Sequence, residues 1–297
     1  MNLDRTEKII LLFCLATFVA SGTLSAQAQF DDRSYGAGDV IIQDESYFTK
    51  PIQIIDMPTA SILRGGAFRA GTRIYEQGGV MASLSAGVSN KVMFGVSFGG
   101  LDIIGNAQKI TWNPMPGVHF IYRVSEESMK MPAIVVGFDS QGYGPYYKES
   151  SGAAPDTSSQ NGAPSPPSQN MFDRYHFKSR GFYAAVSKGY ATFVNAGLHA
   201  GVSYSLEKGE NGSTAPTIFM AADIHVARDL AFLIEYDFAL NDAELHPRGL
   251  LNLGVRWAFG RNMFFDFDLQ NALGTAEEGK TDTRRIIKLT YYGSILN

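Results

Sequence analysis

The chain has 297 residues, 45% of them hydrophobic, and a formal net charge of −4. A mean hydropathy of −0.07 resembles that of a soluble protein, yet a membrane β-barrel has the same average because its lipid-facing and lumen-facing residues alternate. The negative charge excludes the usual kind of nucleic-acid binder, which carries a basic surface, so we expect no nucleic-acid partner.

The N-terminus has the pattern of an export signal. Arg5 and Lys8 precede an apolar run at 9–20, and small residues follow as far as Ala26-Gln27-Ala28. This pattern predicts a signal peptide, residues 1–28, that is cleaved from the mature chain. A membrane anchor is the alternative, but the run is shorter than the roughly 20 residues that a spanning helix needs. Cys14, the single cysteine, lies in the removed segment, so thiol chemistry is excluded.

Residues 29–65 are expected to form a periplasmic lead-in, whose apolar stretch Ile52–Ile55 would seat it under or in the mouth of a barrel. From Gly66 onward, short segments alternate apolar and polar residues, as membrane strands do. In the clearest segment, 194–206, every second residue is apolar. The expected strands span residues 66–75, 79–88, 91–99, 116–123, 132–141, 175–188, 193–206, 215–225, 230–240, 249–258, 262–270 and 284–292.

The connections between these strands are unequal in length. Tight turns at 89–90, 189–190, 227–229 and 260–261 alternate with longer, polar connections, of which 142–174 is the longest. Outer-membrane barrels show this asymmetry, with the short turns in the periplasm. A secreted β-sandwich would explain the alternation but not the asymmetry.

The sequence therefore predicts an all-β protein, an antiparallel transmembrane β-barrel of about 12 strands with a cleaved signal peptide. The barrel would occupy residues 66–297 and lie in the bacterial outer membrane, with outer-membrane lipid around it. Residues 150–168 of the longest loop are rich in Pro, Ser and Gly and are expected to be disordered.

The inward positions of these strands carry charges of both signs, which avoid lipid by facing the lumen. One interpretation is a structural network of ion pairs. The other is a polar passage or a saccharide-binding cavity, in which carboxylates accept hydroxyl protons and arginines donate. The lumen-facing polar candidates are Arg69, Arg73, Arg123, His199, Asp223, Glu235, Asp237, Arg256, Asp266 and Asp268.

Catalytic signatures are absent from the sequence. It contains no G-x-S-x-G, H-E-x-x-H or phosphate-binding glycine loop. A lipid-acting barrel enzyme needs serine and histidine on the barrel wall beside an orienting group, whereas His199 and Ser203 share the inward parity. We therefore expect a non-enzymatic protein with no catalytic residue, no metal ligand and no cofactor, and a lipid-acting enzyme as the least favoured alternative.

Several short stretches resemble the YjbH-type outer-membrane proteins that are associated with exopolysaccharide export. The resemblance spans roughly residues 55–270, and its motifs are structural rather than catalytic. The stretches are Met57-Pro58-Thr59-Ala60, Glu127-Ser128, Pro132-Ala133, Gly137, Gly142-Tyr143-Gly144, Ala185-Val186-Ser187-Lys188, Ile234-Glu235-Tyr236-Asp237 and Leu253-Gly254-Val255-Arg256.

The resemblance implies a barrel that works beside polysaccharide secretion machinery. The expected partners are then a polysaccharide and periplasmic export proteins, and the expected function is to assist exopolysaccharide export or assembly at the cell surface. A porin-like channel for small polar solutes is the alternative, because a barrel alone would allow it.

Overall fold

The computed structural model describes residues 50–106, 109–148, 173–191, 195–208, 214–242, 246, 248–259, 262–274 and 283–294. The expected signal peptide, residues 29–49 of the expected lead-in and the Pro/Ser/Gly-rich part of the longest loop lie outside these residues. Within them, no helix is long and apolar enough to cross a membrane.

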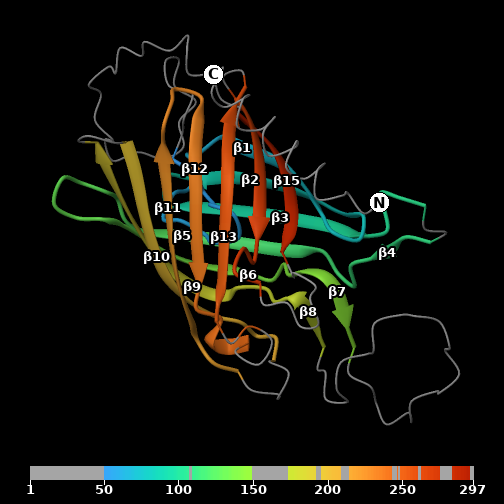
Figure 1. The fold of residues 1–297 in the computed structure, drawn as a ribbon. Coiled ribbons are helices and arrows are strands. Elements are labelled where there is room, and N and C mark those ends of the chain that lie inside the picture. Colours follow the sequence, from blue (N-terminus) through green and yellow to red (C-terminus); the bar gives the residue numbers. More distant parts are fainter. Residues whose placement is uncertain are drawn as a thin grey trace, which may run out of the picture.

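Twelve strands form one closed antiparallel barrel (Figure 1). Each strand pairs with its neighbours along the chain, and β1 pairs with β15 to close the ring, with Arg69 opposite Tyr292. The predicted fold class is confirmed. The barrel strands are β1 (Ala67–Tyr75), β2 (Gly79–Ser89), β3 (Val92–Leu101), β5 (Gly117–Ser125), β6 (Ala133–Asp139), β9 (Gly181–Ala191), β10 (Asn195–Tyr204), β11 (Thr217–His225), β12 (Leu230–Asp237), β13 (Leu250–Ala258), β14 (Met263–Gln270) and β15 (Arg284–Ser294).

The expected strand 175–188 is wrong as a single element. Its first part is β8 (Arg174–Phe177), which leaves the barrel wall and pairs with β7 (Tyr143–Tyr147), while β9 begins only at Gly181. Gly181 adopts a φ of 62°, and a Cβ there would lie 2.2 Å from the carbonyl oxygen of Tyr204. The break therefore needs glycine. The pattern also did not predict the two-residue strand β4 (Thr111–Trp112), which extends the pairing of β3.

The outer surface of the barrel is apolar, whereas the inner side combines charged residues with apolar side chains that pack on residues 52–63. On β3, Phe94 is 46% exposed while its neighbour Met93 is 1% exposed, and the same alternation runs around the ring. A closed sheet leaves no unpaired backbone edge, which is the condition for strands to cross lipid. Together, the ring closure and the apolar exterior make this chain a β-barrel protein of the bacterial outer membrane. The outward apolar residues include Leu84, Phe98, Phe120, Leu198, Val202, Ile218, Phe232, Trp257 and Tyr291.

Residues 50–66 enter the barrel from the end where the short turns lie and form what we call the plug hairpin. Its two arms pair at Gln53 and Pro58, and the N–H of Ile54 donates to the carbonyl of Met57 at 3.0 Å across the turn. Between Ile52 and Leu63, all side chains except those of Gln53 and Pro58, which are partly exposed, are buried inside the barrel. The chain thus fills part of its own lumen.

Strands β7 and β8 form a second hairpin, the mouth hairpin, at the other end of the barrel (Figure 1). Tyr143 of β7 packs edge-on against Tyr75 of the barrel wall and stacks on Phe177 of β8, with ring centroids 5.5 and 4.8 Å apart. The η2 turn (Leu240–Asp242) lies at the same end. Arg174 of β8 binds the Asp242 carboxylate through two nitrogens, at 2.8 and 2.7 Å.

Candidate functional site

The turn of the plug hairpin is bound by a carboxylate of the barrel wall. Glu235, on β12, is fully buried. Its Oε2 accepts the backbone N–H groups of residues 55, 56 and 57 at 3.0, 2.8 and 2.7 Å. Asn252 on β13 donates to the other oxygen at 2.7 Å. Three successive amides around one carboxylate form an anion-binding concavity and offset the cost of burying the charge.

Cations of the wall bind the carbonyl groups of the same turn. Arg73 donates from Nη2 to the carbonyl of Ile55 at 2.8 Å. Lys288 donates to the carbonyls of Ile54 and Ile55, both at 3.1 Å. Arg256 donates to the carbonyls of Gln53 and Ile54, both at 3.2 Å. The wall therefore binds the main chain of the turn: a carboxylate accepts hydrogen bonds from its N–H groups, and three cationic side chains donate to its carbonyls.

Two of these cations also have acidic neighbours on β14. Arg256 binds both carboxylate oxygens of Asp266, at 2.8 and 2.7 Å. Lys288 lies 2.8 Å from Asp268 and 3.4 Å from Asp266. This pairing orients the Arg256 and Lys288 side chains toward the plug hairpin and compensates their buried charges.

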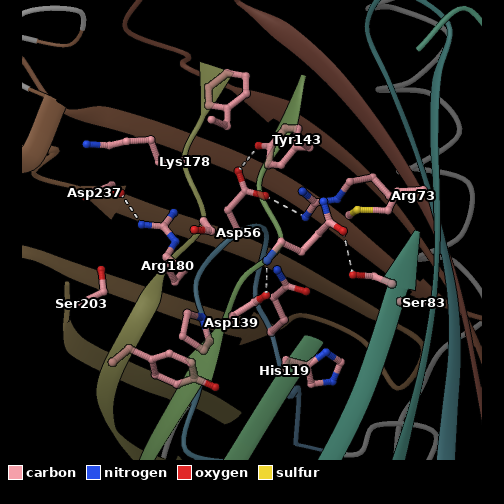
Figure 2. A pocket seen from close by; sticks show the side chains of 18 of the residues that line it. Asp56, Arg73, Ser83, His119, Asp139, Tyr143, Lys178, Arg180, Ser203 and Asp237 are labelled. Atoms are coloured by element: carbon pink, nitrogen blue, oxygen red, sulfur yellow. Dashed lines mark hydrogen bonds and ion pairs between the residues drawn. The ribbon is translucent and has the colours of Figure 1, made fainter. Parts of the chain in front are cut away.

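Asp56, at the tip of the turn, joins the plug hairpin to the mouth hairpin (Figure 2). Its carboxylate lies 2.7 Å from Arg73 and accepts from the Tyr143 hydroxyl at 2.5 Å and from Gln270 at 2.8 Å. Burial raises the pKa of Tyr143 well above its usual range, so the phenol keeps the proton that it donates. The two closures of the barrel meet at this carboxylate.

The second arm of the plug hairpin is bound through a serine. The N–H of Ala60 donates to Ser187 Oγ at 2.8 Å, and Ser187 bonds to His199 Nδ1 at 2.7 Å. His199 Nε2 lies 2.7 Å from Asp223 Oδ1, and His225 lies 2.7 Å from Asp223 Oδ2. These are the residue types of a nucleophilic triad. The serine, however, is buried under the plug hairpin, and its Oγ accepts a hydrogen bond from the N–H of Ala60. The connected hydrogen bonds from Asp223 through His199 and Ser187 therefore hold the second arm of the plug hairpin.

The residues predicted to face the lumen are distributed along the barrel rather than gathered in one cluster. His199 and Asp223 act on the second arm through Ser187, as described above. Asp237 pairs with Arg180 near the mouth hairpin at 2.6 Å. The predicted residues around the plug turn are Arg73, Glu235, Arg256, Asp266 and Asp268.

The remaining two predicted residues lie apart from these groups. Arg123 lies at the short-turn end, where it donates to the carbonyl of Asn90 at 3.1 Å and lies 3.4 Å from Glu126. Arg69 lines a cavity above the plug.

Several residues of the site escaped the sequence analysis. Asp56 and Gln270 were missed because the first precedes the strands and the second ends one. Ser187 was missed because the expected tight turn at 189–190 is wrong. Residues 189 and 190 lie within β9 and pair with β10, and only in this register does Ser187 lie directly opposite His199.

A cavity of about 160 Å³ lies between the plug hairpin, the mouth hairpin and the inner wall. Figure 2 shows Lys178 and Arg180 on one side of it and Arg73 and Ser83 on the other, with Asp56 and Tyr143 between them. Among the residues that the structure describes, no group of histidine, cysteine, aspartate and glutamate side chains is arranged to hold a metal ion.

No protein-family model and no curated protein matches the chain. Solved structures with a similar arrangement include the KdgM porin, at 8% identity and a TM-score of 0.42 over 76% of this chain and 98% of that one. The NanC porin follows at 11% and 0.37, over 77% and 99%. Omp33 of Acinetobacter baumannii follows at 8% and 0.38, over 77% and 97%. At these values the fold assignment rests on this chain's own strand pairing.

Proposed function

We propose that this protein is a porin-like channel for small polar solutes that its own plug hairpin closes. The observation that supports this most is how the plug is held. The wall binds main-chain atoms of residues 53–57 with buried charged groups. The turn of the plug is therefore held by polar contacts that water could replace, in addition to the apolar packing of its side chains.

A charged lumen is suited to polar passage once the hairpin leaves it. Barrels of eight strands are filled by their own side chains, whereas those of 16–18 strands hold a water channel. A ring of twelve strands lies between these limits. Glu235 and Lys288 are two of the charged groups that would then face water, and neither would have to be buried without a partner. Water can replace each hydrogen bond to the plug, whose net worth is roughly 1.5–3 kcal/mol when one partner is charged.

Single-channel recording in planar bilayers tests the proposal. The purified wild-type barrel is compared with a variant in which residues 52–62 are replaced by an equal number of Gly and Ser residues. We expect long openings in the variant and a mostly silent wild type, because the replacement removes the apolar side chains that seat the hairpin, Ile52 to Ile62. Circular dichroism and heat-dependent gel mobility verify that the variant barrel is folded.

A folded variant that conducts no more than the wild type would overturn the proposal, since the lumen would then be closed by something other than the hairpin. Selectivity is read from the same recordings, with neutral and charged solutes of increasing size added to block the current.

Exopolysaccharide export, which the resemblance to YjbH-type proteins implies, stays a prediction. It requires the chain to act with secretion machinery. Surface and released polymer measured in a deletion strain, with a complemented control, would test that role without reference to conductance.

A further inference from the structure

Arg69 on β1 differs from the other arginines of the lumen. Arg73, Arg180 and Arg256 each lie within 2.8 Å of a carboxylate. Arg69 lines the cavity above the plug, and its Nε is buried without a hydrogen-bond partner. Within the described part of the chain, no ion pair compensates its charge. The Arg69 side chain is only partly buried, so its guanidinium is accessible from the cavity, and a bound anion would compensate its charge.

The cavity beside Arg69 exists because small residues occupy neighbouring inward positions. Gly71 on β1 lies opposite Ser83 on β2, and Ser83 lies opposite Ser97 on β3. A Cβ at Gly71 would lie 2.9 Å from Ser83 Oγ and 3.9 Å from Arg69 Nη2. The guanidinium and the hydroxyl of Ser83 therefore border the same space, which is open where larger residues would fill it.

The charges that line the cavity leave a net excess of about one positive charge. Asp56, Asp237 and Asp242 are each paired with an arginine, and Lys288 is paired with acids of β14.

Lys178 donates to a backbone carbonyl, that of Asn241 at 2.6 Å. Asp139 accepts the N–H of Gln141 at 2.9 Å. Arg69 and Lys178 against Asp139 leave one cation uncompensated among the described lining residues. The cavity is thus matched to a monoanion, whereas a dianion would face the remaining carboxylates.

The size of the cavity and its hydroxyl groups narrow the ligand further. A volume of about 160 Å³ is close to that of cavities that accept a single six-membered ring. Ser83, Ser97 and Gln141 add hydrogen-bonding groups, and arginine binds a carboxylate through two parallel hydrogen bonds. We propose that this cavity binds a small, hydroxylated monocarboxylate of single-ring size, with the carboxylate on Arg69 and the hydroxyls on the serine side.

The proposal is tested by isothermal titration calorimetry on the intact protein in detergent. The probes are D-glucuronate, D-glucose and cyclohexanecarboxylate, which carry respectively both features, the hydroxyls alone and the carboxylate alone. We expect glucuronate to bind, glucose to give no measurable heat, and cyclohexanecarboxylate to bind more weakly than glucuronate. Equal binding of glucose and glucuronate, or no binding of glucuronate, would overturn the proposal.

Two variants locate the site. Arg69→Gln should weaken glucuronate binding by roughly tenfold or more, because it removes a charge-assisted, two-bond contact. Gly71→Val keeps the charge but fills the space beside it, and should weaken binding as well.

Arg248→Gln is the matched control, since Arg248 is an exposed arginine outside the cavity, and should leave binding unchanged. Wild-type affinity in both Arg69→Gln and Gly71→Val would place any binding elsewhere and overturn the assignment.

This inference names the solute class of the proposed channel and rests on the proposed function in that sense alone. Binding is measured with the plug in place, whereas conductance is measured with the plug replaced. A barrel that conducts without binding glucuronate would reject only the site, and one that binds it without ever conducting would reject only the channel.

Discussion

The two hairpins that close the barrel are held by different forces. The plug hairpin is bound through its main chain, by Glu235 on one side and by the Arg73, Arg256 and Lys288 side chains on the other. The mouth hairpin is held by aromatic packing, with Arg284 lying 4.7 Å over the ring of Phe177, and by the two hydrogen bonds from Arg174 to Asp242. Both hairpins contact the wall, but the turn of the plug is bound through its main chain, whereas the mouth hairpin is bound through its side chains.

The difference indicates which closure is suited to open. Hydrogen bonds to a main chain can be exchanged for water with a small net change, while buried aromatic pairs lose contact area and their preferred geometry on separation. We infer that wall charges control the plug, and that the mouth hairpin is the more lasting cover. The predictions that follow separate the two.

The largest effect is expected for Glu235→Ala. This change leaves the amides of residues 55–57 without an acceptor, and removal of one member of a buried charged network costs roughly 3–5 kcal/mol. Hydrogen exchange followed by mass spectrometry should show faster exchange at these amides, and bilayer recordings should show more openings. Glu126→Ala is the control, because the Glu126 side chain is 61% exposed. Unchanged exchange at residues 55–57 would contradict the role of Glu235.

Lys288→Met should loosen the plug less. It removes donors to the carbonyls of Ile54 and Ile55 and leaves Asp268 without its cation, but Arg73 and Arg256 still bind the same turn. We expect a loss of roughly 1–3 kcal/mol in the stability of the bound hairpin. Hydrogen exchange provides the measurement, with the exposed Lys91→Met as the control. An effect as large as that of Glu235→Ala would mean that Arg73 and Arg256 cannot hold the turn without Lys288, and would contradict this prediction.

Tyr143→Phe should affect the link between the hairpins by about 1 kcal/mol. The ring keeps its packing on Tyr75 and Phe177, while the hydrogen bond to Asp56 is lost. Limited proteolysis should cut the mouth hairpin slightly faster than in the wild type. Tyr146→Phe, at a tyrosine that packs against Tyr175, should not change the rate. Rapid cutting of the Tyr143→Phe variant would show that the hydroxyl, and not the ring, holds this cover.

The smallest expected effect is a pH dependence of the mouth hairpin. Burial raises the pKa of Glu207 to about 7, although its carboxylate accepts the N–H groups of Tyr175 and Ser179 at 3.3 and 3.2 Å. Because the docked state holds the proton more tightly than a free glutamate does, docking weakens as pH rises through about 7. Hydrogen exchange of residues 174–179 at pH 5.5 and 8.5, corrected for intrinsic rates, should reveal this. A Glu207→Gln variant that keeps the full dependence would assign it elsewhere.

The sequence analysis predicted the barrel because alternation is strong where one face meets lipid, as at 194–206, and because tight and long connections alternate. The prediction failed where no face of a segment meets lipid. The mouth hairpin faces neither lipid nor a regular core, so 143–147 shows no alternation, and 174–177 was merged with the strand that follows it.

Sequence reasoning predicted the wall residues of the candidate site but not the groups that they bind. Parity placed Arg73, Glu235 and Arg256 on the inner wall, because charges avoid lipid. It gave no sign of what they bind, since their partners are peptide groups of residues 53–57, which any side chains could carry. The apolar stretch Ile52–Ile55 showed that this segment needs burial, but not that its backbone faces charges.

The central claim is that the plug hairpin leaves the lumen when the channel opens. It is tested most directly by single-channel recording of Met57→Cys combined with Glu235→Ala, with a thiol-reactive reagent in the bath. Met57 is fully buried in the turn, so we predict modification only in records that contain openings, followed by a channel that stays open. Current that flows while the cysteine remains unmodified would show that the hairpin stays in place during conduction, and would contradict the account.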